Sequence, residues 1–244
     1  MTAVSVAPSV EASAAGPAPS AIVRDTLIMS KRNLRRIRRT PQLVAASSFL
    51  PISFTLMCFY VFGGSVHIPG QTYVDYLIPA MLVLSPLFGG TTAVAMAEDM
   101  AGGMIERFRS LPIARSAVLA GRTVADTARG SLVVVVVLGV GMLLGFRFHN
   151  GFVPGLAAFG LVVAFSFAVS WQMAWIGMTI KDAQAASSAA FVPILIMTFT
   201  GGGLSPVSSL PGWLQAFAHV QPVSVTITTV RALTQGGQIG RAHV

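Results

Sequence analysis

Histidine is the residue type most often found in metal sites and in acid–base catalysis, and this chain has four. His67, His149 and His219 fall in loops or at the expected ends of apolar segments, and His243 lies in the last six residues. None shares a helical face with an acidic residue. The sequence therefore favours no metal site.

Ionisable side chains are almost absent from the long apolar runs, whereas ion-coupled carriers usually have them there. Asp75 precedes one such run. Asp126 lies three residues before Arg129 and four after Arg122, a spacing that allows ion pairs on one helix. This spacing is typical of a solvated helix end, with a proton relay as the alternative.

Motifs for nucleotide binding and hydrolysis are absent as well. The chain has no GxxxxGK[ST] loop to hold ATP phosphates, no HExxH and no GxSxG. A hydrolase within the membrane would need a buried nucleophile with a partner, and none is recognisable. We expect no catalytic residue, no metal and no cofactor bound by this chain.

A charged segment separates two apolar runs at residues 98–115. Its apolar residues Met104, Ile105, Phe108 and Leu111 are spaced as one helical stripe, and Pro112 ends that helix. Such a stripe either folds back on the ends of its own spans or docks on a protein partner.

Composition places the chain among integral membrane proteins of the all-α class. Hydrophobic residues make up 54% and charged residues 10%, with a mean hydropathy of +0.74. Soluble domains have about 25% charged residues. The net charge of +8 does not indicate nucleic-acid binding, because the basic residues flank apolar spans. The single cysteine, Cys58, lies in an apolar run and excludes an intrachain disulfide.

Five membrane spans are predicted from apolar runs long enough to cross a bilayer as helices. They cover about residues 43–62, 77–96, 130–146, 152–176 and 185–200. The loop between the second and third spans covers 98–129. The whole transmembrane domain would extend over 42–235.

Lys and Arg counts predict the orientation. If the N-terminus is cytoplasmic, the inside holds seven basic residues at 24–39, five at 107–129 and Lys181, against Arg147 and Arg231 outside. We expect a multi-pass protein of the cell membrane, with the N-terminus and the charged segment in the cytoplasm.

The first forty-one residues divide into two parts. Residues 1–20 are rich in Ala, Ser and Pro and predict a disordered tail. Residues 21–41 combine a narrow apolar stripe with a cationic face, which is typical of an interfacial helix in contact with membrane lipids. The alternative for this stretch is a topology signal alone.

An outer segment at 204–231 follows the fifth span. It is broken by prolines and too short to span, so we expect it on or dipping into the outer leaflet, with a short amphipathic helix opened by Pro211 and Trp213. Residues 239–244 resemble a translated sequencing adapter, and we expect this tail to be non-native and the chain truncated.

The charged segment resembles the cytoplasmic motif of ABC-2 type permeases, in the actinobacterial daunorubicin-resistance (DrrB-like) branch. The residues that carry the resemblance are Glu98-Asp99-x3-Gly103-Met104-Ile105-Glu106-Arg107-Phe108-Arg109-Ser110-Leu111-Pro112-Ile113. Further matches are Gly121-Arg122-x3-Asp126 and, in the outer segment, Pro206, Pro211, Trp213, Pro222 and Arg231. The family pattern has six spans, and the missing sixth fits a truncated chain.

The resemblance implies a helix bundle that acts as the permease subunit of an ATP-driven exporter. Two permease subunits, identical or paralogous, would pair, and two separate ATPase subunits, holding ATP and Mg, would dock beneath them. Residues 98–112 would form the coupling contact with the ATPase. Nearly uncharged spans suit a hydrophobic drug or lipid as substrate. The alternatives are a secondary carrier and a non-transporting membrane assembly protein.

Overall fold

The computed structural model describes residues 41–65, 70–88, 93–94, 97–98, 115–180, 182–204, 207 and 210–236. The segments predicted as a disordered tail at 1–20 and as a non-native tail at 239–244 lie outside these residues, and so does all but Pro41 of the predicted interfacial helix at 21–41. Within the described part the main elements are helices and no strand occurs. They are α2 (Pro41–Phe62), α3 (Tyr73–Phe88), α6 (Arg115–Leu143), α7 (Phe152–Thr179), α8 (Ala183–Thr200), α9 (Gly212–Val220) and α10 (Pro222–Gln235).

Four of these helices are long and apolar enough to cross a membrane. The qualifying stretches are Val44–Phe62, Ala120–Leu143, Phe152–Thr179 and Ala183–Thr200. They belong to α2, α6, α7 and α8. Their outer faces carry large exposed apolar side chains such as Phe49, Trp175 and Phe191. The chain is an all-α, multi-pass membrane protein.

The second predicted span differs from the helix found there. We expected about 77–96, whereas α3 begins four residues earlier, at Tyr73. Its described part ends at Phe88, and residues 89–92 lie outside the described residues. Thr72 sets the start, because its hydroxyl accepts a hydrogen bond from the Asp75 amide at 3.3 Å and donates one to the Asp75 carboxylate at 2.6 Å. At 16 residues, α3 is about 24 Å long.

The predicted loop at 98–129 contains helix in its second half, because α6 is helical from Arg115 onward. No proline occurs between that residue and the end of α6 at Leu143. The hydroxyls of Thr127 and Ser131 donate hydrogen bonds to the backbone carbonyls four residues earlier, at 2.7 and 2.8 Å. These polar side chains therefore need no partner outside the helix. A single helix of 29 residues therefore joins the charged segment to the third span.

Proline residues interrupt the hydrogen bonding of α3 without ending it. Pro86 cannot donate the amide bond that the Leu82 carbonyl would otherwise receive. The neighbouring Ser85 hydroxyl donates to that carbonyl instead, at 3.1 Å. The backbone stays satisfied in a buried environment.

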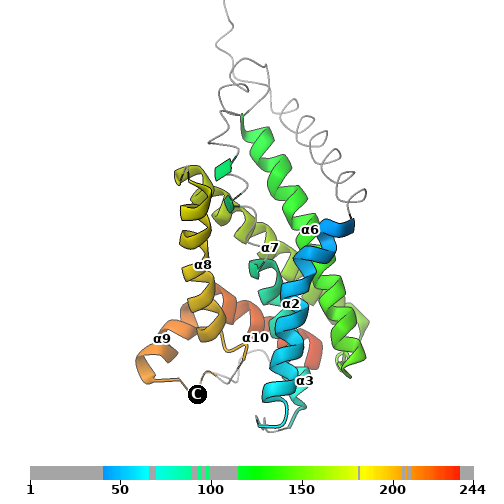
Figure 1. Cartoon of the computed structure of the whole chain (residues 1–244). Coiled ribbons are helices and arrows are strands. Elements are labelled where there is room, and N and C mark those ends of the chain that lie inside the picture. Colours follow the sequence, from blue (N-terminus) through cyan, green and yellow to red (C-terminus); the bar gives the residue numbers. More distant parts are fainter. Residues whose placement is uncertain are drawn as a thin grey trace, which may run out of the picture.

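The apolar helix α3, which is shorter than the four membrane-length helices, forms the centre of the bundle. Leu77, Ile78, Val83 and Leu84 of α3 are fully buried, and α3 packs against α2, α6, α7 and α10. Figure 1 shows α9 and α10 at the end of the bundle opposite the start of α6. The long helices thus surround α3, and α10 closes one end.

Close approach of α6 to α3 depends on Gly141. A Cβ atom there would lie 2.8 Å from Cγ2 of Ile78, whereas one at Gly139 meets nothing within 4 Å. We expect Gly141→Leu to destabilise the protein by about 1–3 kcal/mol through overpacking. Gly139→Leu, the matched control, lacks this penalty and gains helix propensity.

Thermal unfolding of both glycine variants can be followed by thiol labelling of Cys58, the only cysteine in the chain, which is fully buried. Equal midpoints for the two variants would contradict this packing.

Candidate functional site

Most of the predicted coupling segment lies outside the described residues. Glu98 is described and exposed, whereas Asp99, Gly103, Met104, Ile105, Glu106, Arg107, Phe108, Arg109, Leu111 and Pro112 are not. Their docking role stays a prediction. The structure adds that the segment leads into a rigid element, because α6 begins three residues after Pro112.

The outer segment is largely helical. Pro211 immediately precedes α9 and Pro222 opens α10, while Pro206 lies outside the described residues. Trp213 is 76% exposed, as an anchor at a membrane interface would be.

We expected the outer segment to lie on or dip into the outer leaflet, and the structure adds that α10 packs within the bundle. Val223, Ile227 and Val230 are fully buried, and the helix packs against α3 and α7. These apolar residues recur at helical spacing, so one face of α10 enters the bundle.

Arg231 is the most unusual side chain of α10, because it enters the packed region without a carboxylate partner in the described part of the chain. Its guanidinium carbon lies 3.5 Å from the centroid of the Tyr76 ring. Its Nε donates to the Tyr76 carbonyl at 3.0 Å, and its Nη2 is 3.5 Å from the Gly203 carbonyl. The Tyr76 hydroxyl in turn donates to the Gly202 carbonyl at 2.7 Å.

These contacts join α3, α10 and the glycine turn after α8. We call Tyr76, Arg231, Gly202 and Gly203 the arginine clamp. A partly buried cation is costly unless it has compensating contacts, and here two carbonyls accept hydrogen bonds from it and an aromatic face lies against it. From the sequence we counted Arg231 only as a basic residue outside the membrane. Its place directly after Val230, within the apolar stripe of α10, was the signal that could have predicted its contact with the bundle.

A second set of contacts ties the same end of the bundle together. The His149 ring nitrogen Nδ1 lies 2.7 Å from the Gln235 side-chain oxygen, and the Gln235 amide donates to Asp75 at 3.4 Å. The backbone amide of His149 donates to the Thr234 carbonyl at 3.0 Å. The turn between α6 and α7 therefore caps the C-terminal end of α10.

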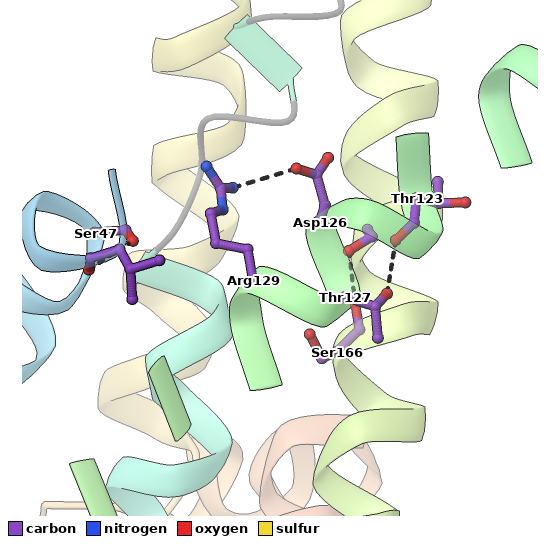
Figure 2. A network of polar contacts seen from close by, with 8 residues as sticks. Ser47, Thr123, Asp126, Thr127, Arg129 and Ser166 are labelled. Carbon is purple, nitrogen blue, oxygen red and sulfur yellow. Dashed lines mark hydrogen bonds and ion pairs between the residues drawn. The ribbon is translucent and has the colours of Figure 1, made fainter. Parts of the chain in front are cut away.

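Asp126 and Arg129 form the predicted ion pair of spacing three, at 3.4 Å. They do not form a helix end, because α6 begins eleven residues before Asp126. Figure 2 shows the pair on α6, with Ser47 of α2 on the other side of Arg129 and Ser166 of α7 nearby. Both side chains are less than one-fifth exposed. The site is thus a partly buried polar cluster within the bundle.

Metal-binding groups are not apparent in this part of the chain. Among the described residues, no three His, Cys, Asp or Glu side chains gather where they could hold an ion.

Comparison with known proteins gives a consistent result. Residues 24–234 match the protein family described as ABC-2 type transporter. The daunorubicin resistance ABC transporter permease protein DrrB1 of Streptomyces coeruleorubidus is 28% identical over 224 residues, covering 90% of this chain and 78% of the relative. The probable doxorubicin resistance ABC transporter permease protein DrrC of Mycobacterium tuberculosis is 29% identical over 219 residues, covering 89% and 79%.

The family match spans nearly the whole chain, and the membrane helices of the structure agree with it. Permeases of this family partner with an ABC ATPase subunit and lack an ATPase site of their own. The chain therefore belongs to the ABC-2 type transporter family, as a membrane permease subunit of an ABC exporter.

Proposed function

We propose that this permease moves a hydrophobic drug or lipid out of the cell, driven by ATP and Mg bound to a separate ATPase subunit. The observation that carries the substrate class is the near absence of charge from α2, α7 and α8. Such surfaces suit an apolar molecule and offer no path for an ion. Two relatives named for daunorubicin and doxorubicin resistance support the same class.

The assembly in this proposal contains two permease subunits, identical or paralogous, and two ATPase subunits. Residues 98–112 dock on the ATPase, with the stripe of Met104, Ile105, Phe108 and Leu111 in the contact. Supporting this, α6 starts at Arg115 and passes through the bundle without interruption. A displacement at the docked segment is then carried along α6 to its contacts with α3.

Reconstitution of the permease with its ATPase tests this function. We expect doxorubicin to stimulate ATP hydrolysis and to accumulate in inverted vesicles only with ATP and Mg. Transport that follows a proton gradient without ATP would favour a secondary carrier. Absence of transport together with specific capture of other membrane proteins would favour an assembly role.

Orientation can be tested with two cysteines placed at opposite ends of the bundle in a Cys58→Ser background. Glu98 and Ser65 are both exposed; Ser65 follows the end of α2, and Glu98 lies beyond the end of α3. With a cytoplasmic N-terminus, we expect a membrane-impermeant maleimide to label Ser65→Cys in intact cells. Glu98→Cys should be labelled only after permeabilisation, and the reverse pattern would contradict the proposed topology.

A further inference from the structure

A small cavity lies where α2, α3, α6 and α7 meet. Its volume is about 20 Å³, enough for one water molecule, and it is partly open to the protein surface. Every one of the four helices contributes a polar side chain to it. These are Ser47, Ser85, Asp126, Arg129, Ser166 and Ser170.

Hydrogen bonding around the cavity leaves one carboxylate oxygen without a partner in the described part of the chain. Arg129 lies 3.4 Å from Oδ1 of Asp126, whereas Oδ2 is buried and has no hydrogen-bond partner among the described residues. A buried carboxylate oxygen without a hydrogen-bond donor is unfavourable, because it has lost its hydration without replacement. A water molecule or ligand that donates a hydrogen bond to this carboxylate from the cavity would therefore bind favourably.

Two serine hydroxyls that line the cavity can act only as hydrogen-bond acceptors. Ser170 donates its proton to the Ser166 carbonyl at 2.9 Å, and Ser85 donates to Leu82 at 3.1 Å. Because their protons are committed to the backbone, these oxygens are left to accept. A group that only accepts hydrogen bonds would find no donor in these two serines.

The remaining walls of the cavity are apolar. Leu87, Val133, Val169 and Met173 line it beside the polar groups. A few convergent polar atoms within an apolar lining are the usual composition of a site for a small amphiphile.

We propose that this cavity is a subsite for a hydroxyl group of the exported amphiphile, which replaces a water molecule and donates a hydrogen bond to Asp126. The inference rests on the proposed function for the identity of the ligand as a substrate. A hydroxyl suits the site better than an ammonium. Arg129 already neutralises the carboxylate, and an added cation would bring net charge into a poorly solvated place.

Photolabelling of the full chain in lipid nanodiscs, with a diazirine-bearing octanol as the probe, tests the subsite. We expect adducts on lining residues of α6 and α7, such as Val133 and Met173. 1-Octanol should compete at about tenfold lower concentration than octyl methyl ether, because a hydrogen bond to a charged group is worth about 1.5–3 kcal/mol. The ether retains the oxygen but lacks the proton.

Two variants and one control separate the subsite from general lipid partitioning. Asp126→Asn should reduce the preference for the alcohol, because it replaces a charged acceptor by a neutral one. Ser170→Ala, which removes an acceptor oxygen from the cavity wall, should weaken it if the first variant fails to fold. Ser188→Ala is the matched control, because Ser188 makes the same backbone bond, to Gln184 at 3.1 Å, but does not line the cavity. It should leave the preference intact.

The outcomes are distinct. Equal competition by the alcohol and the ether, or adducts that avoid the lining, would leave only a resident water and overturn the proposal. The labelling uses neither ATP nor the ATPase. Loss of the alcohol preference with intact ATP-driven export would thus refute the subsite alone. Failure of export with the preference retained would refute the proposed function.

Discussion

Replacing Glu106 and Phe108 together by alanine is expected to reduce ATP-driven transport at least about tenfold while leaving the permease folded. Aromatic anchors at protein interfaces are often worth about 2 kcal/mol or more, and each 1.4 kcal/mol weakens binding tenfold. Phe108 belongs to the apolar stripe, and Glu106 lies beside it. Co-purification of the ATPase and drug-stimulated ATP hydrolysis are the two measurements.

Ser110→Ala provides the matched control, since Ser110 lies in the same segment but outside the apolar stripe. It should preserve both assembly and transport. If the double variant also assembles and transports at the wild-type rate, residues 98–112 do not couple the two subunits.

The positions of the long spans were predictable because hydropathy marks the thickness of a bilayer. The run at 43–62 and α2 end at the same residue, and α7 begins where the fourth span was expected. Hydropathy does not mark the end of a hydrogen-bonded helix, however. Charges between 115 and 129 indicated a loop, although a helix that leaves the membrane can bear charges on its solvated turns.

The arginine clamp could not be predicted, because it joins residues that are far apart in sequence. Arg231 and Tyr76 are separated by 155 positions, and their contact exists only when α10 enters the bundle beside α3. By contrast, the pair of Asp126 and Arg129 is local, and its spacing on one helix was sufficient to predict it. The cavity beside that pair could not be predicted, because its lining comes from four helices that are brought together only by the fold.

Tyr76→Ala is expected to destabilise the protein by about 3–5 kcal/mol, the usual cost of truncating a buried aromatic side chain. Tyr76 is only 6% exposed, so its removal leaves a cavity at the centre of the bundle. The loss also leaves the Gly202 carbonyl without its donor and the Arg231 guanidinium without its aromatic face. For a chain of this size the unfolding midpoint should fall by roughly 6–20 °C, measured by thiol labelling of Cys58.

Two further variants determine whether the arginine clamp, and not the lost volume alone, causes this effect. Tyr76→Phe retains the ring and loses one hydrogen bond, so it should cost only about 1 kcal/mol. Adding Arg231→Met to Tyr76→Ala should raise the midpoint again, because it removes a buried cation that has lost part of its compensation. If the double variant is no more stable than Tyr76→Ala, the guanidinium does not depend on Tyr76, and α10 is held in the bundle by its apolar face alone.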